Sequence, residues 1–331
     1  MVFNRRHLLG TGCAALSTLL APRLVAASHA NAGKYPTKPV RVIVPFAPGG
    51  PNDLLARILA QGLSISLGAQ FYVENLGGAG GNIGTGHASH SAADGYTILT
   101  VAPSYAANPA LFDSVPYDPE KSFDPVTLAA TAPTILTVHP SMAANSVSEL
   151  IDVVRAHPGK YSYASPGTGT PPHLLGELFR TSLQLDMVHV PYNSGGQAIA
   201  STLGGHIPIS FGALPPAVQH VKEGKLRALA ITGTSRADAL AEVPTIAEAG
   251  YPDFAADIWT AVLVPSGTPK PIVDTLQHEI AKLVASTEAK QRMAPLGYRP
   301  VANTPDECAK YIAAEEGRWA KVIQQAGLKV R

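Results

Sequence analysis

The sequence predicts an α/β fold with largely parallel sheets. Apolar, β-branched segments such as residues 40–44 alternate along the chain with amphipathic segments such as residues 272–284. Strands that alternate with helices favour parallel pairing, because parallel strands need a long crossover between them. The chain has 331 residues, of which 46% are hydrophobic and 15% charged, so it is globular and large enough for two lobes.

The predicted elements follow from periodicity and from the Pro and Gly residues that separate them. Strands are predicted at residues 40–44, 70–74, 96–101, 134–138, 161–164, 187–192, 207–211, 226–232 and 259–264. Helices are predicted at residues 54–59, 85–92, 104–111, 146–154, 174–179, 195–203, 215–223, 269–284 and 305–326. Residues 117–125 and 233–258 carry no regular pattern and are predicted as irregular crossings. Ser146 and Glu149 have the spacing of a capping box.

The first thirty residues have the order of an export signal. Arg5 and Arg6 precede a moderately apolar run over residues 8–20, and small residues follow. The run is short and interrupted by Gly and Thr, which argues against a membrane span. The paired arginines resemble a twin-arginine (Tat) signal, and an ordinary Sec signal fits equally well. We therefore expect residues 1–30 to be a cleaved signal peptide and the protein to be periplasmic.

Cleavage is predicted after Ala30, with Ala27 and Ala32 as alternatives. Cleavage also removes Cys13, so Cys308 remains as a single thiol and no disulfide within the chain can form. We expect Cys308 to be a small buried apolar residue on the last helix.

The sequence lacks the motifs that are typical of several classes of function. No basic patch interleaved with aromatic residues is present, so no nucleic-acid partner is expected. The glycine-rich stretch 77–86 lacks the dinucleotide-binding spacing, and no phosphate-binding P-loop or G-x-S-x-G elbow occurs. His173 and Glu177 are four residues apart, but no further residues have metal-ligand spacing. We therefore expect no catalytic residues, no metal and no cofactor.

Four loops that follow predicted strands are rich in Gly, Ser and Thr: residues 46–53, 77–84, 165–173 and 192–196. Each runs into a helix, whose first N–H groups have no partner within the helix and favour an anion. Close packing of helix on strand would explain any one of these loops alone. Four together favour a cleft in which N–H and hydroxyl groups surround a small anion.

These loops belong to an ordered set of stretches that resembles the Bug family, the receptors of tripartite tricarboxylate transporters. The set includes Val-Pro-Phe with Pro-Gly-Gly and Asp53, Val-Glu-Asn with the glycine-rich run 78–84, and His-Val-Pro-Tyr at 189–192. It continues through Gly-Lys-Leu-Arg-Ala-Leu-Ala at 224–230 and covers nearly all of the chain after the signal.

The resemblance implies a two-lobed periplasmic-binding-protein fold of the Venus-flytrap, type II-like kind, with two mostly parallel sheets and a double crossover. Lobe 1 would comprise residues 35–133 and 254–331, and lobe 2 residues 134–253. The cleft would hold a small carboxylate, and the expected partners are the membrane permease subunits of a tripartite tricarboxylate transporter. We expect a monomer.

The expected ligand-binding residues come from the four loops and from the strand ends beside them. They are Phe46, Ala47, Pro48, Gly49, Asn52, Asp53, Ala79, Gly80, Gly81, Asn82, Ser104, Ser165, Thr168, Gly169, Thr170, His173, Tyr192, Gly195, Phe211 and Gly212.

Two departures from the family pattern bear on the ligand. Pro51 stands where a Ser or Thr is usual, which removes a hydroxyl and an N–H, and Gly212 stands where an Asp is frequent. An acid at 212 would suit a ligand ammonium, so its absence argues against amino acids. We expect a carboxylate without a positive group, with aromatic carboxylates among the candidates. Two alternatives stay open: a sensor that presents its ligand to a membrane signalling protein, and an exported hydrolase that uses Ser165.

Overall fold

The structure is a computed structural model that describes residues 35–233, 235–254 and 257–329. The predicted signal peptide, residues 1–30, lies outside the described residues. The strands are β1 (Val40–Val44), β2 (Phe71–Asn75), β3 (Thr97–Val101), β4 (Phe123–Val138), β5 (Tyr161–Ser165), β6 (Met187–Pro191), β7 (Ile209–Ala213), β8 (Arg227–Ile231), β9 (Asp257–Pro265) and β10 (Arg299–Pro300). The α-helices are α1 (Pro51–Leu67), α2 (Asn82–Ser89), α3 (Ser104–Leu111), α4 (Val147–Arg155), α5 (Pro171–Ser182), α6 (Gly195–Leu203), α7 (Leu214–Lys222), α8 (Lys270–Ala285), α9 (Thr287–Met293) and α10 (Pro305–Ala326).

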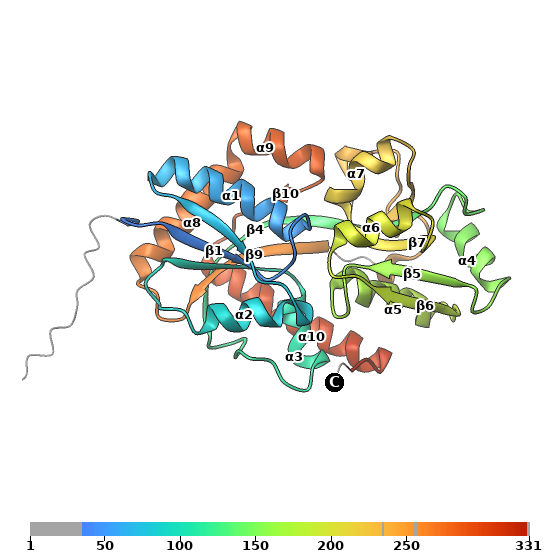
Figure 1. The fold of residues 1–331 in the computed structure, drawn as a ribbon, viewed down its shortest axis with the longest axis horizontal. Coiled ribbons are helices and arrows are strands. Elements are labelled where there is room, and N and C mark those ends of the chain that lie inside the picture. The colour runs from blue at the N-terminus through green and yellow to red at the C-terminus, as the bar shows by residue number, and fades with distance from the viewer. Residues whose placement is uncertain (1–34, 234, 255–256, 330–331) are drawn as a thin grey trace, which may run out of the picture. The chain divides into compact units, whose positions relative to one another are not determined.

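The strands form one mixed sheet rather than the two mostly parallel sheets that were expected. Its order is β2-β1-β3-β9-β4-β7-β5-β6, with β8 and β10 also paired to β4. Strand β1 is parallel to β2 and β3, and β5 is parallel to β6 and β7. Every pairing made by β4 or β9 is antiparallel. The sheet is continuous because the long strand β4 pairs with β7 of one parallel group and with β9, which in turn pairs with β3 of the other group (Figure 1).

The first part of β4 was not predicted: residues 123–125 were wrongly assigned to an irregular crossing, and residues 126–133 were assigned to no element. Residues 123–133 pair with β9, although Pro125 and Pro133 flank an Ala-rich stretch that shows no alternation of polar and apolar residues. Both prolines discourage a strand assignment, because proline cannot donate to a sheet ladder. The short elements α9 and β10 were also missed. The predicted helices 104–111 and 305–326 are confirmed with their boundaries.

The helix caps differ in one respect from the prediction. Ser146 caps α4, and its Oγ accepts a hydrogen bond from the N–H of Glu149 at 3.1 Å. The Glu149 carboxylate, however, accepts from the N–H of Asn145 at 2.8 Å, so the reciprocal half of the capping box is displaced by one residue. A complete capping box forms instead at α10, between Thr304 and Glu307.

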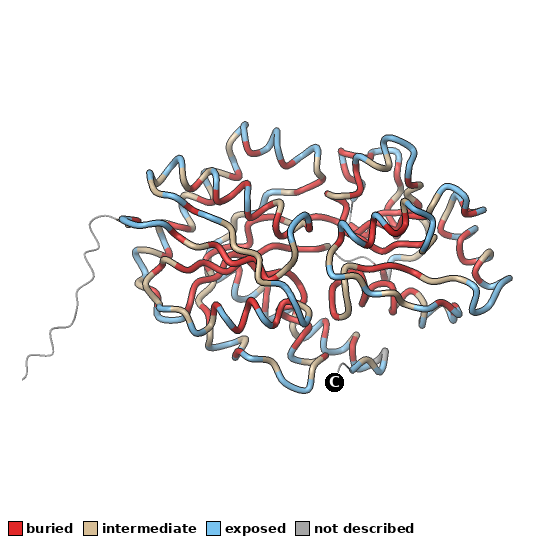
Figure 2. The backbone as a smooth tube through the Cα atoms, viewed as in Figure 1, coloured by how far each residue is buried: buried red, intermediate tan, exposed pale blue. Residues whose placement is uncertain are grey.

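Helices cover both faces of the sheet, and the buried residues follow its central strands (Figures 1 and 2). On one face, α1 and α8 pack over one end of the sheet, while α6 and α7 pack over the other end. On the opposite face, a larger core cluster joins residues from α3, α4, α5 and α10. Cys308 of α10 is fully buried in this cluster, as predicted, and burial raises the pKa of its thiol to about 12.

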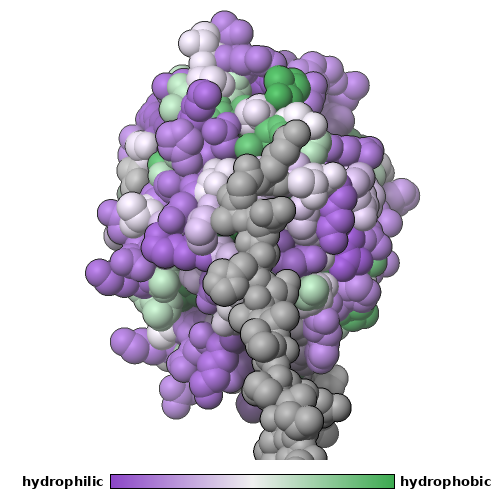
Figure 3. All heavy atoms as spheres, turned by 90° about the vertical axis from the view of Figure 1, so that its left-hand side faces the viewer, coloured by the Kyte–Doolittle hydropathy of each residue, from purple (hydrophilic) through white to green (hydrophobic). Residues whose placement is uncertain are grey.

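The surface of the described residues carries few large apolar side chains. Hydrophilic side chains predominate on the face shown in Figure 3, with apolar ones in small separate groups. The exposed large hydrophobic residues are Ile65, Tyr72, Ile83, Val188 and Val301. None of the helices in the described part of the chain has the length and apolar character needed to cross a membrane.

A buried carboxylate joins α10 to the central strand β9. Oε2 of Glu315 accepts hydrogen bonds from the indole Nε1–H of Trp259 at 2.9 Å and of Trp319 at 3.1 Å. The Glu315 residue is 7% exposed, and Trp259 is fully buried. The carboxylate therefore satisfies two indole donors that would otherwise be buried without an acceptor.

We expect Glu315→Leu to lower the free energy of unfolding by about 2–5 kcal/mol, because two buried donors lose their acceptor. Glu315→Gln is the matched control: its amide oxygen can still accept, so the loss should be less than half as large. Urea denaturation of both variants measures the difference. Equal losses in the two variants would contradict this role for Glu315.

Candidate functional site

The N-termini of four helices meet at one small cavity. Its lining includes Gly50, Thr170, Ser194 and Ala213, which are the N-cap residues of α1, α5, α6 and α7. These helices are 17, 12, 9 and 9 residues long, so each carries a partial positive charge at this end. The cavity, which we call the inner cavity, has a volume of about 60 Å³. That exceeds the roughly 10–15 Å³ that one water needs, so a group of a few heavy atoms fits.

Few backbone donors line the inner cavity despite this convergence. Pro51, Pro171 and Pro172 occupy first-turn positions of α1 and α5 and have no N–H. Helix α6 has no proline in its first turn. Its cap, Ser194, accepts from the N–H of Gln197 at 3.3 Å, which leaves the N–H groups of the first two residues of α6 available. Of the helices α1, α5 and α6, only α6 therefore keeps every N–H group of its first turn.

A larger cavity of about 710 Å³ adjoins the inner one. The two share Phe46, Ala47, Pro166, Thr170 and Asn193. We call the larger one the outer cavity; it is lined by Phe46, Ala47, Pro48, Asn75, Gly77, Gly78, Ala79, Gly80, Gly81, Phe112, Pro166, Gly167, Thr168, Thr170, Pro191, Tyr192 and Asn193. Strands β1, β2, β5 and β6 all end at this site, as the loop pattern predicts.

Asp53 holds the first loop in shape from behind the cavities. Its carboxylate accepts from the N–H of Gly49 at 2.9 Å, from Nε of Arg57 at 3.0 Å and from Nδ2 of Asn75 at 2.9 Å. Burial disfavours the charged form of this carboxyl, but the hydrogen bonds from Arg57, Gly49 and Asn75 outweigh burial and lower its pKa. Asp53 therefore lines neither cavity and positions residues that do.

Glycines allow the loops to touch one another. A Cβ atom at Gly77 would lie 3.1 Å from the backbone N of Ala47, so the second loop can approach the first only without a side chain there. At Gly167, where φ is +131°, a Cβ atom would lie 3.0 Å from the carbonyl oxygen of Tyr192. Part of the glycine pattern thus serves packing between the loops that form the cavity wall.

The expected binding residues divide into two groups. One group lines the cavities: Phe46, Ala47, Pro48, Asn52, Ala79, Gly80, Gly81, Thr168, Thr170, Tyr192 and Gly195. The other group lines neither: Gly49, Asp53, Asn82, Ser104, Ser165, Gly169, His173, Phe211 and Gly212. Phe211 is a fully buried core residue, and Asn82 accepts a hydrogen bond from Asn108 within the protein.

Some lining residues were not expected from the sequence. Phe112 lines the outer cavity from the end of α3, and Ala102 and Ile258 line the inner one from the ends of β3 and β9. None lies in a glycine-rich loop, so the sequence carried no local signal for them. Pro51, Pro166, Pro191 and Asn193, by contrast, lie in or beside the four loops.

Ser165, His173 and the partly buried His189 form a cluster behind the third loop. The Oγ of Ser165 lies 2.7 Å from Nε2 of His189, and the two histidine rings lie 4.1 Å apart between centroids. Nδ1 of His173 accepts the N–H of Gly169 at 3.1 Å, which requires that nitrogen to be unprotonated. Ser165 is fully buried and pairs with His189 rather than with His173, and its Oγ also accepts from the N–H of Gly167 at 3.2 Å, so its hydroxyl supports the third loop.

Burial is the main cause of the lowered pKa values of these two histidines. The pKa of His173 falls to about 4, with Glu177 opposing and Arg180 adding to the shift. The pKa of His189 falls to about 3, and the neighbouring His173 adds to the effect of burial. The Glu177 carboxylate accepts hydrogen bonds from the hydroxyl of Tyr163 at 2.7 Å and from Nη2 of Arg180 at 2.6 Å. Among the described residues, no group of three His, Cys, Asp or Glu side chains could hold a metal ion.

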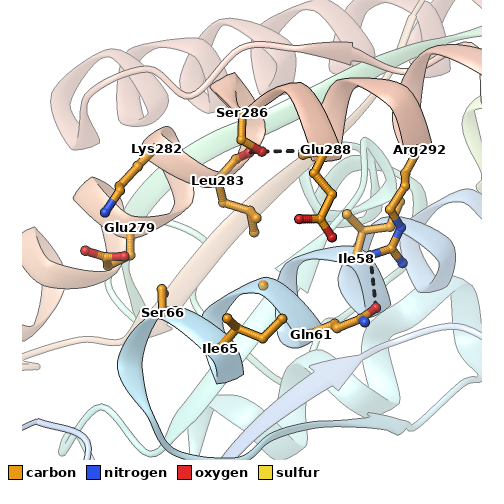
Figure 4. A pocket seen from close by; sticks show the side chains of 12 residues that line it. Ile58, Gln61, Ile65, Ser66, Glu279, Lys282, Leu283, Ser286, Glu288 and Arg292 are labelled. Atoms are coloured by element: carbon orange, nitrogen blue, oxygen red, sulfur yellow. Dashed lines mark hydrogen bonds between the residues drawn. The ribbon is translucent and has the colours of Figure 1, made fainter.

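A separate surface groove lies between α1, α8 and α9 (Figure 4). Gln61 and Arg292 face each other across it and form a hydrogen bond of 2.9 Å. No helix N-cap other than Ser286 lines this groove, and none of the four glycine-rich loops reaches it. The paired inner and outer cavities are therefore the stronger candidate for a ligand site.

The histidine cluster makes stability depend on pH in a defined direction. Between about pH 6.5 and 4 both histidines stay mostly neutral in the folded protein, whereas in the unfolded chain they bind protons in this range. Their contribution is fully present above about pH 6.5 and is lost as the pH falls towards 4. The slope is up to about 1.4 kcal/mol per pH unit for each histidine.

We expect the double variant His173→Gln/His189→Gln to have a shallower decline of unfolding free energy than the wild type between pH 6.5 and 4.5. Urea denaturation across this range measures it, with the two proteins normalised at pH 8. Parallel curves would show that the histidines are solvated or charged in the folded protein.

Comparisons with known proteins agree on one family. Residues 55–328 match the family described as the tripartite tricarboxylate transporter family receptor. Protein BugT of Bordetella pertussis is 38% identical over 309 residues, which is 92% of this chain and 94% of that protein. A solved periplasmic transporter is 40% identical with a TM-score of 0.87, covering 89% of this chain and 99% of that one. Rpa4515 of R. palustris, solved with adipate, is 33% identical with a TM-score of 0.87 and covers 89% of this chain and 99% of its own.

The matched region includes the N-termini of α5, α6 and α7 and the loops of both cavities except the first. The fold of this chain is accordingly that of the periplasmic binding proteins it resembles. This chain belongs to the family of tripartite tricarboxylate transporter receptors and is a solute-binding protein, not an enzyme.

Proposed function

We propose that the protein captures a small carboxylate with its charged group in the inner cavity and its body in the outer cavity. The observation that carries this proposal is the convergence of four helix N-termini on a space of about 60 Å³. Helix N-termini stabilise a negative charge through their dipoles and free N–H groups. No lining residue of either cavity has a charged side chain, so no lysine or arginine in the lining offers an alternative partner for an anion. Adipate in the related Rpa4515 supports a carboxylate as the ligand class.

Backbone donors on both sides of the outer cavity add to this support. The N–H groups of Ala47, Gly78 and Thr168 donate to no backbone acceptor among the described residues. Ala47 and Gly78 follow β1 and β2, whereas Thr168 follows β5. A bound carboxylate oxygen or a bridging water would satisfy these groups from opposite walls.

The two walls belong to the two lobes of our proposal, residues 35–133 with 254–331 and residues 134–253. The hydrogen bonding of β4 changes partner at the proposed boundary: Phe123–Pro133 pair with β9, and Thr134–Val138 pair with β7 and β8. Closure of such lobes on a ligand is a hinge motion about the crossing strands. A Cβ atom at Gly169 would lie 2.6 Å from Cδ2 of Leu111, so a glycine at 169 permits close approach of the lobes.

We place this function in the periplasm, after export by a signal within residues 1–30. The relatives support the location, since one solved homologue is described as a periplasmic transporter. The ligand-bound receptor would act as a monomer that docks to the membrane permease subunits of a tripartite tricarboxylate transporter. Family membership supports these partners.

A thermal-shift screen of mono-, di- and tricarboxylates and amino acids tests the ligand class. A ligand that binds the folded protein raises its apparent melting temperature by mass action. We expect at least one carboxylate without an ammonium group to raise it. Stabilisation by amino acids alone would overturn the proposal.

Ser194 offers a sharper test of the helix N-termini. Asp is as good an N-cap as Ser, so Ser194→Asp should keep α6 intact while placing a negative charge on the inner cavity. We expect carboxylate affinity to fall at least about tenfold, as for a loss of about 1.4 kcal/mol. Ser194→Asn, a neutral cap of the same size, is the matched control and should retain most of the affinity. Calorimetric titration measures both; unchanged affinity in Ser194→Asp would place the charged group elsewhere.

A further inference from the structure

Three aromatic side chains from separate elements line the outer cavity. Phe46 follows β1, Phe112 ends α3, and Tyr192 follows β6. They surround a space of about 710 Å³ whose lining residues carry no charged side chain. We infer that the receptor selects a carboxylate with an aromatic body, whose ring packs against Phe46 and Phe112. This inference rests on the proposed function. It specifies the chemical class of the ligand body, which extends from the carboxylate into the outer cavity.

Glycines on the second loop make room for both phenylalanine rings. A Cβ atom at Gly80 would lie 3.5 Å from Cε2 of Phe112, and one at Gly81 would lie 3.3 Å from Cζ of Phe46. The two rings therefore border consecutive residues of the same loop. From the third loop, a Cβ atom at Gly169 would lie 3.7 Å from Cε2 of Phe112. Phe112 thus lies where the second and third loops meet.

All three rings are supported from behind, which keeps them in position before a ligand arrives. Phe46 is partly buried and packs against the core beneath α1 and α8, whereas Phe112 packs against the core of the opposite face. The hydroxyl of Tyr192 donates to Oγ of Ser201 on α6 at 2.6 Å. Rigid aromatic walls favour a flat, polarisable ligand, because ring pairs gain from offset or edge contacts beyond their buried area.

The polar groups of the wall do not suit a cationic body. Asp53 is the nearby acid of the first loop, and its carboxylate is already bound by Gly49, Arg57 and Asn75. No acidic side chain is among the residues that line the outer cavity. A flexible aliphatic chain would fit the volume, but it would lose rotational freedom on binding and gain no ring contacts. The aromatic class is therefore the better match to this wall.

Two pairs of probes separate aromatic character from charge. Terephthalate and adipate are dicarboxylates of similar length, and benzoate and hexanoate are monocarboxylates. Calorimetric titration of the wild-type protein at pH 7.5 should give at least one pair in which the aromatic member binds about tenfold tighter or more. The aliphatic member binding as tightly in both pairs would overturn the inference.

Phe112→Leu keeps the apolar volume and removes the ring, so it should reduce the aromatic preference at least about threefold. Tyr72→Leu is the control, since Tyr72 is an exposed aromatic residue on β2 that lines neither cavity. If Phe112→Leu fails to fold, Phe46→Leu tests the second ring in the same way. An unchanged preference in the folded variant would also overturn the inference.

Failure of this inference can be told apart from failure of the proposed function. Binding of aliphatic carboxylates without any aromatic preference removes the aromatic class and leaves carboxylate capture standing. No binding by any carboxylate of the screen would remove both.

Discussion

The arrangement of this molecule depends on the backbone hydrogen bonding of a single strand, β4. A buried strand must satisfy its N–H and C=O groups on both edges. Strand β4 does so with β9 and β10 over one part of its 16 residues and with β7 and β8 over the other. Two parallel groups of strands are thereby fixed within one sheet, and their carboxyl ends face a common site. Without this shared strand, the helices that follow β1, β5, β6 and β7 would have no reason to begin at the same place.

Because the four helices begin at one place, their individually weak stabilising effects act on the same anion. One helix N-terminus stabilises a neighbouring anion by a fraction of a kcal/mol to about 2 kcal/mol, depending on how far the site is shielded from water. Four termini around a small cavity act on the same charge, and prolines in the first turns of α1, α5 and α7 limit the number of backbone donors that desolvation would leave unpaired. The receptor can therefore hold an anion without a lysine or arginine in the wall. Because the walls carry no charged side chain, selectivity for the body of the ligand depends on its shape and on contacts between rings.

Sequence patterns predicted the local units of this fold better than their assembly. The segment from Val40 to Leu59 was predicted as strand, loop and helix because the signals for all three follow one another directly in the sequence. The first part of β4 was missed because Pro125 and Pro133 mask a strand whose partners are more than a hundred residues away. In the site, the four loops were found, but Phe112 was not, since it becomes part of the wall only when α3 packs beneath the second loop. The pairing of Ser165 with His189 is likewise set by the register of β5 against β6, which no local motif reports.

The carboxylate of Asp53 has a consequence for the thermodynamics of ligand capture. It accepts hydrogen bonds from Gly49, Arg57 and Asn75 within the protein, so these bonds hold the first loop without any contribution from a ligand. Ordering a loop at the moment of binding would consume part of the interaction free energy as lost conformational entropy. Here that entropy is lost during folding instead. Under the proposed closure of the two lobes, the favourable contacts of a bound solute are then available to draw the walls together.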